Sequence, residues 1–232
     1  MNQFSVVIPS RNVSNLILCA EAVRKCEPDA RIIIMDDGLG LDWLPRPDLM
    51  PALGHICPKP FIFARNCNIG IGLAERDDVV LLNDDALLTT PGGFSAIQKT
   101  AHEHPEYGVI SAACNNVGNR AQNLRPGCRL RGDLQMVCFV AAYIPRATID
   151  KVGLLDEDLI GYGYDDDLYC RRVRDAGLKI GVHDGGFVDH SKLHPTFRGL
   201  PNVNALMDQN RAIYQSKVGP SDPRLKLVTR AV

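Results

Sequence analysis

Short apolar runs rich in Val, Ile and Leu alternate along the first half of the chain with longer segments of mixed polarity. Such runs are typical of buried strands, whereas the longer segments favour helices. The strands are predicted at residues 4–9, 31–35, 60–66, 79–85 and 107–114. The helices are predicted at residues 14–26 and 90–104, capped by Ser14 and Thr90, with a further helix ending near residue 76. This alternation predicts an α/β fold, with a mostly parallel central sheet flanked by helices.

The second half of the chain is less regular. Residues 115–135 are polar and carry four arginines, so we expect a long loop or a β-excursion there. A helix is predicted at residues 165–176 because Gly177 is a suitable C-cap, and a last helix is predicted at residues 203–217. Residues 39–60 are rich in proline and are expected to form an irregular connection.

The bulk composition is that of an ordinary globular protein. Hydrophobic residues make up 45% and charged residues 23% of the 232 residues, enough for one substantial core. The net charge of -1 provides no global field that would attract nucleic acid or an acidic membrane. No apolar stretch reaches the roughly 20 residues that span a bilayer, and residues 1–8 lead directly into a strand rather than a signal sequence. The eight cysteines form no Cys-x-x-Cys pair, so we expect reduced thiols and a cytoplasmic protein.

Polar and charged residues follow four of the predicted strands. These groups are Pro9-Ser10-Arg11-Asn12, Asp36-Asp37-Gly38, Arg65-Asn66 and Asn83-Asp84-Asp85. The carboxyl ends of parallel strands share one edge of a sheet, where ligands bind in open α/β folds, so we expect the four groups to line one crevice. Arginine binds phosphate oxygens, and carboxylates hold Mg²⁺ or Mn²⁺. The crevice therefore suits a nucleotide diphosphate and its cation, although the two aspartates taken alone also fit a solvated turn.

A second acidic cluster lies in GYGYDDDLYCRR, residues 161–172, where three consecutive aspartates, Asp165–Asp167, open a predicted helix. Carboxylates in a first turn stabilise a helix through its dipole, which is one interpretation of the cluster. The other is that one aspartate acts as a general base toward an acceptor hydroxyl. Further along, His190 and His194 in FVDHSKLHP are candidate metal ligands at the end of a late strand.

Seven segments occur in an order that resembles the family-2-type glycosyltransferases with the GT-A fold. They are SVVIPSRN, IIIMDDG, ARNCNIGIGLA, LLNDDA (the counterpart of the DxD-type metal motif), GLLDEDLIGYGYDDDLYCRRVRDAGLKI, FVDH and NRAIYQSKVG. The resemblance covers roughly residues 4–219. It implies a single GT-A domain at residues 1–219, with a Rossmann-like, nucleotide-sugar-binding half at 1–114, an acceptor-side half at 115–219 and a C-terminal tail at 220–232.

The resemblance also implies roles for individual residues. The nucleotide sugar would be bound by Pro9, Arg11, Asp37, Arg65, Asn83 and Asp84. Among these, Asp37 would contact the base, Arg65 the diphosphate, and Asn83 and Asp84 the ribose and the donor sugar. Asp85 would bind Mn²⁺ or Mg²⁺, with His190 as a further ligand or diphosphate contact. The catalytic base would be Asp165 or Asp166.

The predicted function is that of a metal-dependent, hexosyltransferase-like enzyme. It would move a sugar from a nucleotide sugar, above all a UDP-sugar, to an acceptor hydroxyl with inversion of the anomeric centre. One alternative is a nucleotidyltransferase of the nucleotide-diphospho-sugar type, although SRNVSN is a poor phosphate loop. Another is a non-catalytic sugar-nucleotide-binding module.

The acceptor stays open among four classes: a glycan, a lipid-linked sugar, a protein and a modified DNA base. The polar loop could hold an anionic acceptor or close over the donor diphosphate through its arginines, which are Arg120, Arg125, Arg129 and Arg131.

Overall fold

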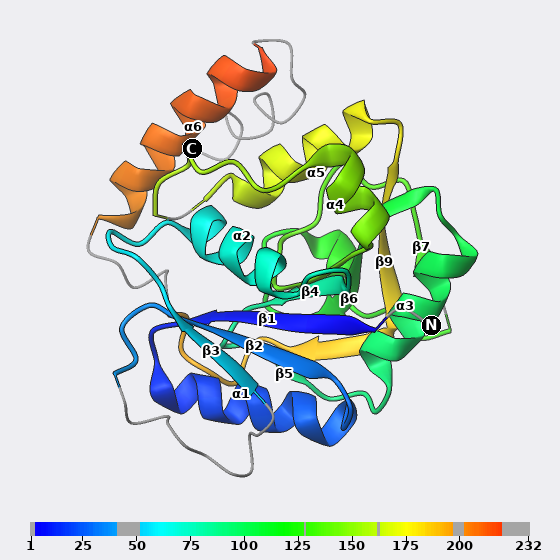
Figure 1. Cartoon of the computed structure of the whole chain (residues 1–232). Coiled ribbons are helices and arrows are strands. Elements are labelled where there is room, and N and C mark those ends of the chain that lie inside the picture. The colour runs from blue at the N-terminus through cyan, green and yellow to red at the C-terminus, as the bar shows by residue number, and fades with distance from the viewer. Residues whose placement is uncertain (1–2, 41–51, 128, 162, 197–201, 220–232) are drawn as a thin grey trace.

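The computed structural model describes residues 3–40, 52–127, 129–161, 163–196 and 202–219. The strands are β1 (Phe4–Ser10), β2 (Arg31–Asp36), β3 (Ala52–Ile56), β4 (Asp78–Leu82), β5 (Leu87–Leu88), β6 (Tyr107–Cys114), β7 (Leu130–Arg131), β8 (Ala141–Ile144) and β9 (Lys179–Asp189). The helices are α1 (Val13–Cys26), α2 (Phe63–Leu73), α3 (Gly93–Glu103), α4 (Arg146–Val152), α5 (Asp165–Asp175) and α6 (Val203–Val218). Figure 1 shows their arrangement around one central sheet.

The nine strands form a single sheet in the order β3-β2-β1-β4-β8-β6-β9-β5, with β7 paired to β9. The four strands β1 to β4 run parallel to one another, and β6 runs parallel to β9. Between these two groups, β8 is antiparallel to both β4 and β6. The predicted α/β fold, with a sheet that is mostly parallel in its core, is confirmed.

Helices cover both faces of the sheet because successive side chains of a strand point to opposite sides. Val6 and Ile8 of β1 face one layer, formed with α1 and α3. Val7 between them and Ile33 of β2 face the other layer, formed with α2, α4 and α5. In Figure 1, α1 lies below the sheet and α2, α4 and α5 lie above it. Burial on both faces explains why the sequence of these strands is continuously apolar.

Two predictions about the segment between β2 and β4 are wrong. Residues 60–66 are not a strand, because α2 begins at Phe63 and places Arg65 in its first turn. The small residues Ala64, Cys67 and Gly70 recur at helical spacing and let this helix pack closely on the sheet. Residues 39–60 are not wholly irregular either, since they contain β3, which pairs with β2. Residues 41–51 lie outside the described part of the chain.

Both predicted N-caps are also wrong. The cap of α1 is the side chain of Asn12, which accepts a hydrogen bond from the Asn15 amide at 3.1 Å. The first turn of α3 is capped by Glu27, a residue at the end of α1, whose carboxylate accepts from the amides of Phe94 and Ser95.

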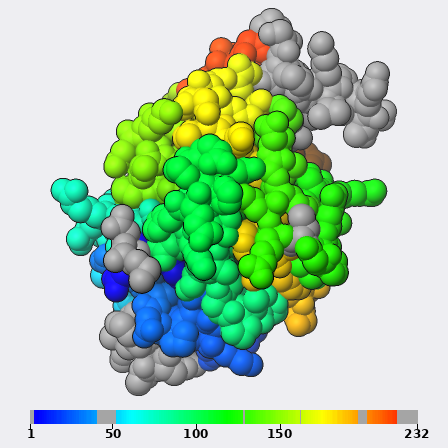
Figure 2. Space-filling view, turned by 90° about the vertical axis from the view of Figure 1, so that its right-hand side faces the viewer, coloured from blue at the N-terminus to red at the C-terminus, as the bar shows by residue number. Residues whose placement is uncertain are grey.

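The last helix, α6, lies apart from the sheet and packs on α5 (Figure 1). The rings of Tyr164 and Tyr214 contact each other there, with their centroids 5.4 Å apart and their planes tilted by 37°. The predicted tail, residues 220–232, lies outside the described residues. In the space-filling view, α1 (blue) lies at the bottom and α5 (yellow) at the top of one face, so segments from both halves of the chain share a surface (Figure 2).

Within the described ranges, no helix is both long and apolar enough to cross a membrane. The seven cysteines of these ranges are all free thiols, and most of them are buried, as reduced thiols in apolar segments are expected to be.

Candidate active site

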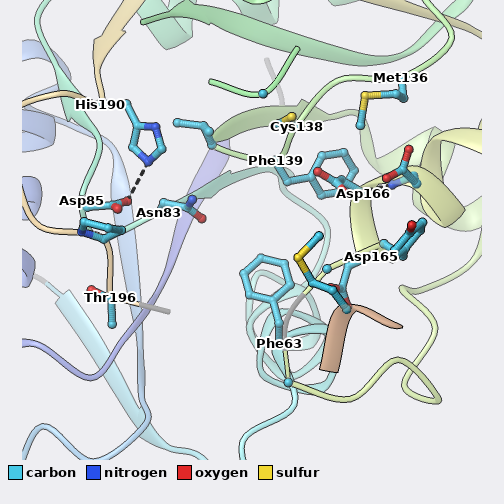
Figure 3. A pocket seen from close by; sticks show the side chains of 18 of the residues that line it. Phe63, Asn83, Asp85, Met136, Cys138, Phe139, Asp165, Asp166, His190 and Thr196 are labelled. Atoms are coloured by element: carbon cyan, nitrogen blue, oxygen red, sulfur yellow. Dashed lines mark hydrogen bonds and ion pairs between the residues drawn. The ribbon is translucent and has the colours of Figure 1, made fainter. Parts of the chain in front are cut away.

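A pocket of about 320 Å³ lies where the parallel strands end. Asn83 and Asp85 enter it from the turn after β4, and His190 enters it from the residue after β9. Asp165 and Asp166 enter from the first turn of α5. Figure 3 shows the His190 group and the Asp165 group on opposite sides of the pocket. The structure therefore brings together two acidic clusters that lie 80 residues apart in the chain.

Asp84 is buried beside the pocket rather than facing it. One carboxylate oxygen accepts from the Ser10 hydroxyl at 2.5 Å, and the other accepts from the Thr196 hydroxyl at 2.7 Å. Burial raises the pKa of Asp84 to about 6, even though these two hydrogen bonds lower it. Asp84 thus ties the end of β1 to the segment after β9, and it does not line the pocket as a donor-sugar contact would.

Asp85 and His190 form the pair that best fits a cation. Both side chains are buried, and the Nε2 of His190 lies 3.1 Å from an Asp85 oxygen. The other ring nitrogen, Nδ1, lies 3.0 Å from the backbone oxygen of Asn116. A carbonyl can only accept, so Nδ1 carries the hydrogen, as is usual for a histidine that binds a metal through Nε2.

The backbone around His190 is held firmly. Its amide donates to the Asn115 side chain at 2.7 Å, and the preceding Asp189 accepts from Ser191 and Asn115. These hydrogen bonds, with Ser191 contributing most, keep the pKa of Asp189 well below its usual range. By contrast, His194 is exposed, and its contact among the described residues is through its backbone oxygen, which accepts from Asn15. The structure therefore favours His190 over His194 as the ligand.

Two ligands leave most of a cation's coordination sphere to other groups. Among the described residues, no three His, Cys, Asp or Glu side chains are grouped closely enough to hold a metal ion by themselves. An arrangement with one carboxylate and one imidazole fits Mn²⁺ or Mg²⁺ that is also bound by phosphate oxygens. The residues present therefore fit a cation that arrives with a diphosphate.

Asp37 lies at the end of β2, on the same edge as Ser10, whose carbonyl accepts from its amide. Its Oδ1 pairs with Lys59 at 2.8 Å, while its buried Oδ2 has no partner among the described residues. An unpartnered carboxylate oxygen at this edge is suited to accept from a nucleotide base N–H. Lys59 was not anticipated from the sequence, because a single lysine in a proline-rich stretch carries no pattern.

The remaining residues predicted to bind the nucleotide sugar lie in two different places. Arg11 is exposed at the end of β1, and Pro9 is buried within that strand. Arg65 instead donates to the backbone oxygens of Pro58 and Pro60, which fastens the loop before α2. The prediction that Arg65 follows a strand end is wrong, because the strand there is β3 and Arg65 lies in a helix.

Asp165 stands out in the acidic cluster. It is buried at the start of α5, and its Oδ1 has no hydrogen-bond partner among the described residues. Burial, assisted by the nearby charge of Asp166, raises the pKa of Asp165 well above its ordinary value. Asp166 differs because one of its oxygens accepts from the Asp167 amide at 2.9 Å, a contact within the first turn of α5. The geometry thus separates two residues that the sequence left equivalent.

The arginines of the polar loop do not reach the pocket. Arg131 is held by Asp184, with its Nε 2.7 Å from a carboxylate oxygen, and also donates to the backbone oxygens of Ala121 and Asn123. Arg120, Arg125 and Arg129 are exposed, and the described residues along the pocket include no arginine. In the described structure the loop neither closes over a diphosphate nor offers an anion site beside the pocket.

Known structures resemble the chain in fold. GalNAc-T7, crystallised with UDP, GalNAc and Mn²⁺, superposes with a TM-score of 0.71 and 13% identity, over 93% of this chain and 48% of that chain. The 1–349 fragment of TarS from S. aureus superposes with a TM-score of 0.61 and 13% identity, over 80% of this chain and 60% of that chain. The chain thus spans about half the length of these proteins. No protein-family model and no curated protein sequence matches it. The chain has the GT-A glycosyltransferase fold.

Proposed function

We propose that the protein is a glycosyltransferase that moves a sugar from a nucleotide sugar to an acceptor hydroxyl. The observation that carries the proposal is the pocket itself. On a GT-A fold, it combines a buried Asp85–His190 pair on one side with a buried, unpartnered Asp165 oxygen on the other. One side suits a diphosphate with its cation, and the other suits removal of a proton from an alcohol.

The donor is proposed to be a UDP-sugar. GalNAc-T7, which shares this fold, was crystallised with UDP and Mn²⁺. In this chain, the free Oδ2 of Asp37 would accept from the base, and Arg11 would approach the nucleotide from the end of β1. Asp85 and His190 would hold Mn²⁺ or Mg²⁺, which when bound neutralises the charge of the departing diphosphate. Asn83 lines the pocket next to Asp85 and would contact the donor sugar.

The chemical step is proposed to be a single displacement with inversion. The acceptor oxygen forms a bond to the anomeric carbon while the bond from that carbon to the diphosphate oxygen breaks, and the electron pair leaves with UDP. Asp165 takes the acceptor proton, for which its raised pKa makes it a stronger base than an ordinary carboxylate. Residues 1–114 would form the donor half and residues 115–219 the acceptor half of this one domain.

The proposal is tested by measuring UDP binding calorimetrically with and without Mn²⁺, and by following slow UDP release from UDP-sugars. We expect Mn²⁺-dependent binding in the wild type. Asp85→Ala should weaken that binding by at least about tenfold, because one of the two cation ligands is removed.

Asp156→Ala is the matched control, since Asp156 pairs with Lys217 and does not line the pocket. It should bind UDP as the wild type does. No Mn²⁺-dependent binding and no UDP release across a panel of UDP-sugars would refute the proposal. Unchanged affinity in Asp85→Ala would remove Asp85 from the cation site.

A further inference from the structure

The side of the pocket next to Asp165 is walled by apolar side chains. They come from four segments, namely the residues that lead into α2, the segment before β8, the residue before α5, and α6: Phe61, Phe63, Met136, Phe139, Tyr164 and Met207. Figure 3 shows the labelled members Phe63, Phe139 and Met136 around Asp165 and Asp166, on the side away from His190. A wall of this composition favours an apolar group as the part of the ligand that it contacts.

Two of the lining residues are fixed by contacts, Phe139 through its ring and Met136 through its backbone. The ring of Phe139 meets the ring of Tyr169 edge-on, with centroids 5.9 Å apart. The backbone oxygen of Met136 accepts from the Asn119 side chain at 2.7 Å. Rigid aromatic walls contact a flat group at little entropic cost, so this part of the pocket is preorganised for one.

The edge of the pocket formed by α6 is flexible. Met207 of α6 is 40% exposed, and methionine is the most flexible of the apolar side chains. Asn210, on the same helix, holds the backbone of Ile160 and Gly163. Its side chain donates to their two backbone oxygens and accepts from the Ile160 amide. A side chain at Gly163 would meet Met207 at 3.3 Å, so the glycine leaves room for this edge.

The polar groups at this end limit the acceptor further. Among the described lining residues they are the Cys138 thiol, the Tyr164 hydroxyl and the carboxylates of Asp165, Asp166 and Asp167, and the described lining includes no Lys or Arg. A phosphate-bearing acceptor would meet repulsion there. The carboxylates can accept from the sugar hydroxyls next to them, but the other hydroxyls of the ring would lie against Phe and Met side chains, and each of those left without a partner costs binding energy. An alcohol on an aromatic ring meets neither penalty.

We infer that the acceptor is an uncharged aromatic alcohol, whose ring lies between Phe63 and Phe139 and whose hydroxyl faces Asp165. This inference rests on the proposed function and names its acceptor class. The hydroxyl oxygen bonds to the anomeric carbon of the donor, the proton passes to Asp165, and UDP leaves with the electron pair. The product is an aryl or arylalkyl glycoside.

An acceptor panel tests the inference with the full chain, a UDP-sugar and Mn²⁺. The panel contains 4-methylphenol and 2-phenylethanol as aromatic alcohols, a methyl pyranoside as a neutral sugar, and glycerol phosphate as an anionic alcohol. Products are identified by mass spectrometry, and UDP binding is measured separately. We expect glycoside formation with the aromatic alcohols only.

Variants of the apolar wall give the second test. Phe63→Ala and Met207→Ala should each raise KM for the aromatic alcohol by about tenfold, because each removes a contact with the ring. Leu154→Ala is the control, since Leu154 is 45% exposed and does not line the pocket; its KM should equal that of the wild type. Neither substituted wall residue is fully buried, so both variants are expected to fold.

The outcomes separate the two proposals. Normal UDP binding together with transfer to the pyranoside or to glycerol phosphate, and none to the aromatic alcohols, would overturn the acceptor assignment and leave the glycosyltransferase proposal standing. An unchanged KM in both wall variants would also overturn it. Absence of UDP binding would instead refute the glycosyltransferase proposal itself.

Discussion

At the scale of single residues, the environment of each aspartate favours a different role. Asp84, Asp85 and Asp165 are all buried carboxylates, yet their partners differ. Asp84 has both oxygens engaged by hydroxyl groups, Asp85 faces an imidazole, and Asp165 keeps one oxygen without a partner among the described residues. A structural tie, a cation ligand and a proton acceptor are the roles that these three environments favour.

Asp165→Asn tests the assignment of the base. Turnover should fall by roughly 10²- to 10⁴-fold, because an amide cannot take the acceptor proton, while UDP affinity should be kept. Asp166→Asn is the matched control, because the Asp166 carboxylate accepts from the Asp167 amide and its loss should cost far less turnover. Equal loss of turnover in the two variants would contradict the assignment.

The pH dependence of transfer provides an independent check on Asp165. The base acts only when it is ionised, and burial raises its pKa well above the ordinary value. Activity should therefore rise with pH through this raised pKa, so that the acidic limb lies well above the ordinary carboxyl range near about 4. A pH–rate profile whose acidic limb lies near that ordinary value would exclude Asp165 as the base.

At the scale of elements, the sequence predicted what depends on local pattern. Strands β1, β2, β4 and β6 were predicted because each is a continuous apolar run. Because Asp37 and Asp85 come just after β2 and β4 in the sequence, their place at the carboxyl ends of these strands was predicted too. The start of α2 was missed because its N-cap residue, Ile62, has no side chain that can cap a helix. The His190 contact with the Asn116 backbone was beyond prediction, since any residue supplies a carbonyl.

The cap of α3 was also beyond prediction from local pattern, because it comes from a residue far away in the sequence. It gives a prediction on stability. Glu27 lies 67 residues before Phe94, yet its carboxylate accepts from the Phe94 amide at 2.7 Å, the Ser95 amide at 3.0 Å and the Ser95 hydroxyl at 2.6 Å. Glu27→Ala should lower the free energy of unfolding by about 2 kcal/mol, because buried amides lose their acceptor and the helix dipole loses a charge. Urea denaturation measures the change.

Glu103→Ala serves as the control for this cap. Glu103 lies in the last turn of the same helix, and its side chain is 58% exposed. Its substitution should change the free energy of unfolding by less than about 0.5 kcal/mol. A similar change in the two variants would mean that the Glu27 contacts do not stabilise α3.

At the scale of the whole molecule, the site depends on how closely the helices approach the sheet. Phe63, at the start of α2, lines the pocket, and its position follows from the packing of that helix over β1 and β2. Gly70 lies in the middle of the contact, where a Cβ would meet the Cγ1 of Val7 at 2.4 Å. The sequence does not reveal this contact, because Gly70 and Gly72 look alike in the segment NIGIGL.

The two glycines of α2 therefore give opposite predictions. Gly70→Ala should push the helix away from β1 and lower the free energy of unfolding by about 1–3 kcal/mol. Because Phe63 moves with the helix, KM for the acceptor should rise as well. Gly72→Ala meets nothing within 4 Å, so it should raise the free energy of unfolding by up to about 1 kcal/mol through helix propensity alone. Thermal and urea unfolding of the pair would measure the contrast, and stabilisation by both substitutions would show that α2 does not depend on close contact at Gly70.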